Sequence, residues 1–191
     1  KPYLNTSVFE IWKSRIPWLF LLMLSATFTG AIISGFENEL TKSAVGSALI
    51  AFIPMLMGTG GNAGGQSSVT IIRGLAVEEI RMGDIFRIIF KELRVSLLCS
   101  VSLAVVNFGK MLLIDNLLFN NPKIDVYVAL TVSLTLVLVV VVAKIVGCTL
   151  PVLAKRIGLD PAVMASPFIT TIIDAVSLLI YFGIASAFVL I

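Results

Sequence analysis

The chain has 191 residues, of which 58% are hydrophobic and only 13% are charged, and its formal net charge is +3. Soluble domains carry roughly 25% charged residues, so this composition and a mean hydropathy of +1.06 exclude an ordinary soluble protein and indicate an all-α integral membrane protein. A chain of this length has room for one membrane domain with about five spanning helices.

The first 16 residues mix apolar and charged side chains, which predicts a short interfacial lead-in segment. The rest of the chain, residues 17–191, is predicted as a transmembrane domain whose first span is the apolar run at residues 17–36. Because the chain begins at Lys1 and no signal peptide precedes this span, we expect a membrane domain cut from a longer protein.

The second predicted span, residues 44–72, contains five glycines within eight positions. A four-residue spacing such as that of Gly60 and Gly64 lets membrane helices approach closely, while Asn62 and Gln66 fall on one helical face. The glycines do not indicate a phosphate-binding loop, because no Gly-Lys-Ser/Thr follows them and no strand precedes them. Tight packing without any further role is an alternative interpretation of this segment.

Residues 73–94 alternate charges of both signs with isoleucines, which predicts an amphipathic surface helix on the cytoplasmic side. A solvated helix face explains this pattern better than a surface for nucleic acid, so no nucleic-acid partner is expected. The third span is predicted at residues 95–114, and the polar segment 115–125 is predicted as a loop.

The fourth predicted span, residues 126–147, is nearly pure leucine, valine and threonine, which favours a lipid-facing helix with little chemistry. Lys144, Lys155 and Arg156 cluster toward its end and mark that end as cytoplasmic. Pro151 is predicted to interrupt the helix.

The sequence Gly158-Leu-Asp-Pro161 predicts a helix stop followed by the start of the fifth span, residues 161–191. Asp174 lies near the middle of this span, where an ionised carboxylate costs about 2.5 to 3.5 kcal/mol and needs compensation. The helical period places five polar side chains on one wet stripe: Ser166, Thr170, Asp174, Ser177 and Tyr181.

Basic residues gather at the amino terminus, after the second span and after the fourth span. With five spans, the positive-inside rule places the amino terminus in the cytoplasm and the carboxyl terminus outside. In this topology the segment around Asn62 and the stripe around Asp174 both enter from the cytoplasmic half, so we expect them to pack around a wet passage.

We expect the partner of Asp174 to be a cation from solution, because no lysine or arginine of the apolar runs is predicted deep enough to pair with it. A two-fold axis beside the fifth span would bring two copies of Asp174 together, and their charges would neutralise one divalent ion. Oxygen ligands suit Mg²⁺ or Ca²⁺, and Mg²⁺ dehydrates reluctantly, which favours a hydrated ion. The alternative is a protonated Asp174 inside a packed bundle.

Five motifs follow one another along the chain: Pro54-Met-Leu-Met-Gly-Thr-Gly-Gly-Asn-Ala-Gly-Gly-Gln-Ser, Ile72-Arg-Gly-Leu-Ala, Lys91-Glu-Leu-Arg, Leu159-Asp-Pro-Ala and Pro167-Phe-Ile-Thr-Thr-Ile-Ile-Asp. With these motifs the chain resembles, over nearly its whole length, the membrane domain of the MgtE magnesium channel family. The resemblance implies a homodimer of five-span subunits in a bacterial cell membrane, with a Mg²⁺-selective pore on the two-fold axis between spans two and five.

The resemblance also implies which residues meet the transported Mg²⁺. It makes Asp174 the main pore residue and places Thr170, Ser166 and Asn62 near the ion path. Ser177 stands three residues after the acid, where many family members have glycine, and it completes the candidate metal site.

Full-length members of the family resemble one another in cytoplasmic amino-terminal regions, including a paired CBS module, that sense Mg²⁺ and close the pore. These regulatory regions are not among the 191 residues. We therefore expect the chain to show weakened gating by intracellular Mg²⁺, or none.

Two other functions are open alternatives. An ion-coupled transporter would exchange Co²⁺, Mn²⁺ or Mg²⁺ with protons or Na⁺, and its flux would depend on those gradients. A structural membrane subunit that transports nothing would tolerate neutral substitution of Asp174. An intramembrane aspartyl protease needs two acids at membrane depth, and only Asp174 is placed there, so an enzyme is disfavoured.

Overall fold

The computed structural model describes residues 2–164 and 166–188, except for the side chains of Val163, Met164 and Ser166. These ranges form helices joined by short turns and contain no strand, which confirms the all-α prediction. The α-helices in chain order are α1 (Val8–Lys42), α2 (Gly46–Ala51), α3 (Ile53–Ala76), α4 (Ile85–Lys110), α5 (Val126–Arg156) and α6 (Ser166–Phe188). Shorter segments are the 3-10 helices η1 (Tyr3–Asn5), η2 (Met82–Asp84) and η4 (Pro161–Met164) and the π-helix η3 (Met111–Leu118).

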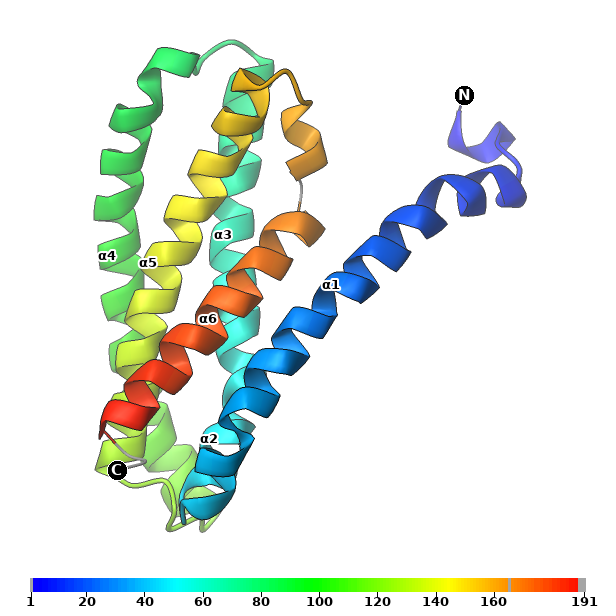
Figure 1. Ribbon diagram of the computed structural model, residues 1–191. Coiled ribbons are helices and arrows are strands. Elements are labelled where there is room, and N and C mark those ends of the chain that lie inside the picture. The colour runs from blue at the N-terminus through cyan, green and yellow to red at the C-terminus, as the bar shows by residue number, and fades with distance from the viewer. Residues whose placement is uncertain (1, 165, 189–191) are drawn as a thin grey trace.

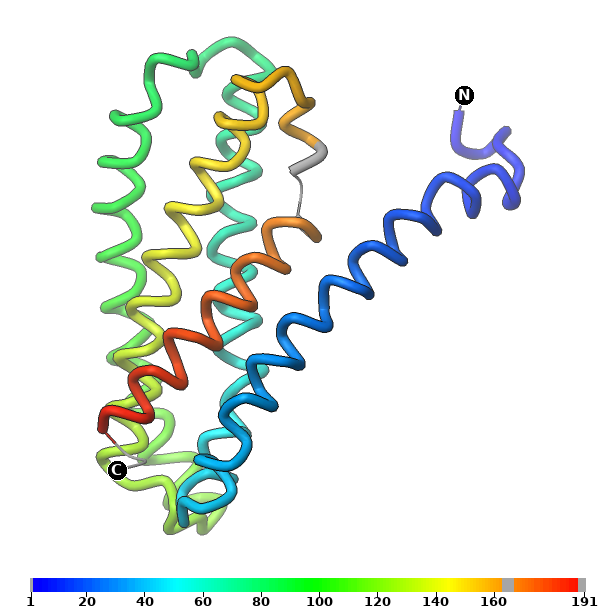
Figure 2. Tube along the Cα trace, viewed as in Figure 1, coloured from blue at the N-terminus to red at the C-terminus, as the bar shows by residue number. Residues whose placement is uncertain are grey.

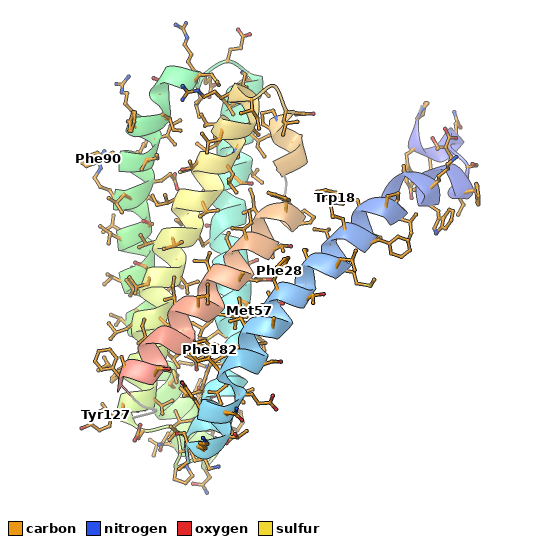
Figure 3. The ribbon with its side chains drawn as sticks, viewed as in Figure 1. Trp18, Phe28, Met57, Phe90, Tyr127 and Phe182 are labelled. Atoms are coloured by element: carbon orange, nitrogen blue, oxygen red, sulfur yellow. The ribbon has the colours of Figure 1, made fainter. Side chains whose placement is uncertain are left out.

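The helices α3 to α6 form a bundle, and the amino-terminal half of α1 leaves it at a slant (Figure 1). The trace in Figure 2 runs the length of the bundle along α3, returns along α4 and runs the length again along α5. Figure 3 shows Phe90 on the outer side of α4 and Tyr127 at the start of α5, toward opposite ends of the bundle.

α1 is one helix of 35 residues, so it joins part of the predicted lead-in segment to the predicted first span. Ser7 caps its start, because the Ser7 hydroxyl accepts a hydrogen bond from the backbone N–H of Glu10 at 3.2 Å. None of the residues in its most apolar 18-residue window is buried by the described chain. The apolar surface of α1 is therefore available to lipid or to another protein.

α5 lies at the centre of the bundle, which contradicts the prediction of a lipid-facing helix. It packs against α3, α4 and α6, and 56% of its most apolar 18-residue window is buried, compared with 17% for α4. The prediction was wrong because lipid and a protein core are equally apolar, so composition alone does not tell which of them a membrane helix faces.

The prediction that Pro151 interrupts the fourth span was also wrong. α5 continues through Pro151 and ends at Arg156, five residues later. Proline removes one backbone hydrogen bond, but packing against neighbouring helices allows a membrane helix to tolerate this loss. Pro151 is buried in such packing.

The turn before α6 confirms the predicted helix stop and start. Gly158 follows the end of α5 with a φ of +84°, a conformation that glycine adopts without strain. Asp160 then accepts a hydrogen bond from the backbone N–H of Ala162 at 3.0 Å, and η4 begins at Pro161. This turn sends the chain back along the bundle as α6.

Four stretches of the described chain are long and apolar enough to cross a membrane: Val8–Lys42, Met82–Leu118, Val126–Arg156 and Pro167–Phe188. The second of them includes η3, so the helix continues into the segment predicted as a loop from residue 115. α3 is not among these four, because its glycines and amides lower its hydropathy. With 24 residues, α3 is nevertheless about 36 Å long, which is enough to cross the hydrocarbon core.

Candidate ion-binding site

Glycines allow α3 to lie directly against α5 and α6. A Cβ atom added at Gly60 would lie 3.0 Å from Ile173 Cγ2 and 3.2 Å from Ser177 Oγ, both on α6. A Cβ atom added at Gly147 of α5 would overlap the backbone of Gly64 on α3. The side of α3 that faces α5 and α6 therefore uses small residues for close packing, as the four-residue spacing predicts.

A cavity of about 250 Å³ lies between α3 and α6. Its lining comes from these two helices: Met57, Gly58, Gly61 and Asn62 of α3, and Thr170 and Asp174 of α6. The structure thus brings together Asn62, Thr170 and Asp174, three of the predicted site residues, although Asn62 is distant in sequence from the other two.

Helical geometry explains how these side chains meet. Thr170 and Asp174 are four residues apart and so lie on the same face of α6. On α3, Gly61 leaves space for Thr170, because a Cβ atom added there would lie 3.3 Å from Thr170 Cγ2. The glycine therefore fixes both the approach of the helices and the room beside Asp174.

The cavity is lined by oxygen atoms of low polarizability. Asp174 supplies the carboxylate, Asn62 an amide oxygen and Thr170 a hydroxyl. In the described part of the chain, the Asp174 side chain forms no ion pair or hydrogen bond, and no three His, Cys, Asp or Glu side chains gather as a metal site. One chain therefore contributes a single carboxylate to this cavity, with neutral oxygen donors beside it.

The other predicted residues of the α6 stripe lie elsewhere. Ser177 is buried against Gly60 of α3 and does not line the cavity. The hydroxyl of Tyr181 donates a hydrogen bond to the carbonyl oxygen of Leu49 at 2.6 Å, inside the bundle. Ser166 begins α6, but its side chain lies outside the described residues.

Sequence reasoning missed the position of Lys144. It was grouped with the basic residues at the end of the fourth span, but it lies 12 residues before Arg156, about 18 Å along the helix axis. Its side chain is only 5% exposed, and its ammonium group donates a hydrogen bond to Gln66 Oε1 on α3 at 3.4 Å. A lysine does therefore lie deep in the bundle, although it pairs with an amide and not with Asp174.

Comparison with known proteins identifies the family. The MgtE family, described as "Divalent cation transporter", matches residues 53–184. The chain is 37% identical over 183 residues to the magnesium transporter MgtE of Thermus thermophilus, 39% identical over 189 residues to that of Bacillus subtilis, and 33% identical over 176 residues to that of Enterococcus faecalis.

These alignments cover 96%, 97% and 92% of this chain, but only 38%, 39% and 36% of the respective relatives. The chain therefore spans about two fifths of the length of the curated relatives that it matches. The residues that match the family include all of α3, most of α6 and the lining of the cavity between them. The family match and the identities over nearly the whole chain show that it belongs to the MgtE family.

Proposed function

We propose that this chain moves Mg²⁺ passively across a bacterial membrane, and that Asp174 is the residue that attracts the ion. The cavity between α3 and α6 supports this proposal, because it holds one carboxylate, an amide and a hydroxyl and offers the acid no basic partner within the described chain. An ionised carboxylate at membrane depth needs a compensating charge, and a cation in transit supplies it. The relatives named as magnesium transporters support Mg²⁺ as that cation.

The proposed pore is formed by two copies of the chain. A single Asp174 balances only half the charge of a divalent ion, whereas a two-fold axis beside α3 and α6 would place two carboxylates around one Mg²⁺. In one subunit the Asn62 side chain is exposed and the Asp174 side chain is only half-buried. The cavity between α3 and α6 is therefore open on one side, and the proposed partner subunit would complete it there. A monovalent ion would leave such a site with excess negative charge.

The proposed ion keeps its water molecules. Mg²⁺ prefers six oxygen ligands in an octahedron and loses water reluctantly. Six waters of about 30 Å³ each occupy roughly 180 Å³, and the cavity of one subunit already provides about 250 Å³. The oxygens of Asn62, Thr170 and Asp174 would then accept hydrogen bonds from bound water, so that selectivity depends on the size of the hydrated ion.

The proposed topology has five spans, with α3 as the second of them. The amino terminus would lie in the cytoplasm and the carboxyl terminus outside, in agreement with the basic residues after α3 and at the end of α5. α3 would be the least apolar span because it lines the pore.

Mg²⁺ influx into proteoliposomes tests this function. We expect Asp174→Asn and Asp174→Ala to lower the flux to that of protein-free vesicles, because both remove the charge that offsets the ion. The matched control is Asp160→Asn, which removes an exposed acid from the turn before η4 and should leave the flux unchanged.

The same assay separates the alternatives. Influx driven by a membrane potential alone supports passive movement, whereas a requirement for a proton or Na⁺ gradient would replace it with a coupled transporter. Full flux in both Asp174 variants, with folding intact, would contradict the proposed role of this acid.

A further inference from the structure

A second and larger cavity lies between α3, α4 and α5, and Asn62 of α3 lines both this cavity and the one beside Asp174. Its volume is about 640 Å³, which is within the range of roughly 300 to 1,000 Å³ typical of sites for small organic ligands. Most of its wall is apolar, including Leu98 and Leu103 of α4 and Val140 of α5. Gln66 of α3 and Lys144 of α5 form a polar end.

Lys144 is a buried positive charge with incomplete compensation. Its ammonium group has three N–H donors, and its hydrogen bond within the described chain is the one to Gln66 Oε1. No carboxylate of the described residues lies within ion-pair distance of it. Charged groups inside membrane proteins are normally paired, because an unpaired buried charge is costly. The end of the cavity where Lys144 lies therefore favours an anionic ligand.

The polar end of the cavity lies toward the basic end of α4. α4 runs antiparallel to α3 and α5 (Figure 1). Leu98 and Leu103 of α4 line the cavity together with Lys144, and Leu103 lies more than one helical turn farther than Leu98 from the basic end of α4. Arg94 precedes Leu98 by about one turn, and it is exposed beside Phe90 on the outer side of α4 (Figure 3). The cavity thus runs from a charged end at Lys144, on the side of the basic end of α4, to an apolar end farther from it.

The cavity borders the apolar outer surface of α4. Leu98 is 74% exposed and Leu103 is 42% exposed, and both lie on the apolar outer surface of α4. An occupant that reaches Lys144 from this surface has to be compatible with lipid tails along most of its length. Inorganic phosphate meets the charge requirement, but it leaves the apolar walls without a partner.

We propose that this cavity binds an anionic phospholipid from the cytoplasmic leaflet. A phosphate oxygen of the lipid accepts hydrogen bonds from the Lys144 ammonium group, and one acyl chain lies against Leu98, Leu103 and Val140. The charge of Lys144, the apolar walls and the exposed leucines of α4 at the edge of the cavity carry this assignment. The proposal concerns a different ligand from the proposed function and rests on Lys144, which does not line the cavity beside Asp174, although Asn62 lines both cavities.

Lipid retention tests the charge recognition. The whole chain would be purified in detergent with equal amounts of phosphatidylglycerol and phosphatidylcholine, and the bound lipid would be counted by native mass spectrometry. Because hydrogen bonds to charged groups are stronger than neutral ones, we expect Lys144→Met to weaken retention of phosphatidylglycerol about tenfold or more. Lys144→Arg should keep it, and Lys155→Met, which removes an exposed lysine from the same helix, should not change it.

Cys99 lines the same cavity and reports on its occupancy. We expect a small thiol reagent to modify Cys99 more slowly with phosphatidylglycerol than with phosphatidylcholine, and we expect this protection to disappear in Lys144→Met. Cys148 is fully buried and gives little background.

Three outcomes would overturn the proposal. Equal retention of the two lipids would show that the charge is not recognised. Protection of Cys99 by inorganic phosphate alone would indicate a phosphate site that needs no acyl chain. Unchanged protection in Lys144→Met, with the Lys144→Arg variant confirming that the fold tolerates substitution, would remove Lys144 from the site.

Discussion

At the scale of single residues, Tyr181 connects α6 to the short helix α2. Its hydroxyl donates a hydrogen bond to the carbonyl oxygen of Leu49 at 2.6 Å, and both residues are almost fully buried. Tyr181→Phe removes this hydrogen bond and keeps the ring, so we expect a loss of about 1 kcal/mol of stability. The expected result is a lower Tm of the purified protein, measured in detergent.

Tyr127→Phe is the control for Tyr181→Phe, because Tyr127 is 70% exposed at the start of α5. Its Tm should equal that of the unmodified protein. If Tyr181→Phe also left the Tm unchanged, the buried hydrogen bond would contribute nothing net to stability.

The residue-level predictions succeeded where a local rule applied and failed where a side chain reaches across the bundle. Thr170 and Asp174 were predicted on one face of a helix, because a spacing of four residues fixes this. Ser177 lies at the edge of the same stripe, and only the packing of α6 on Gly60 decides that it turns toward α3. Lys144 was misplaced because its partner Gln66 is 78 positions away in sequence.

At the scale of helices, the contact between α3 and α5 depends on Gly147. A Cβ atom added at Gly147 would overlap the backbone of Gly64, and a backbone cannot move aside as a flexible side chain can. We expect Gly147→Ala to separate the two helices and to destabilise the bundle by about 1 to 3 kcal/mol. Thermal unfolding in detergent measures this effect.

Gly109→Ala is the matched control for Gly147→Ala, because a Cβ atom added at Gly109 of α4 meets no atom within 4 Å. It should leave the Tm unchanged or raise it slightly, since alanine favours the helix. Equal Tm values for both variants would mean that α3 and α5 adjust to the extra methyl group.

Helix positions were easier to predict than helix environments. Apolar length predicted the four stretches that are long and apolar enough to cross a membrane, and Gly158 with Asp160 predicted the turn before α6, because each of these signals is local in the sequence. The burial of α5 could not be read in this way, since a valine-rich segment is stable in lipid and in a protein core alike. The small residues Ala143 and Gly147 were the available signal for a buried helix.

At the scale of the whole molecule, α3 runs from one end of the bundle to the other (Figure 2). Ser47 of α2 precedes α3, and Lys123 precedes α5. These two residues lie side by side, because Lys123 Nζ donates a hydrogen bond to Ser47 Oγ at 3.3 Å. Glu79 lies at the other end of α3, in the turn that leads to η2 and α4. Both α3 and the stretch Met82–Leu118 therefore connect the same two ends of the bundle, and the latter is apolar enough to cross a membrane.

This arrangement predicts that α3 also crosses the membrane. We expect an impermeant maleimide to label Ser47→Cys and Lys123→Cys from the outer face of oriented vesicles, and Glu79→Cys from the cytoplasmic face. Lys123→Cys is the internal control, because its side is fixed by the strongly apolar stretch Met82–Leu118. Labelling of Ser47→Cys and Glu79→Cys from the same face would contradict a spanning α3, and it would also move the cavity between α3 and α6 out of any continuous path through the bilayer.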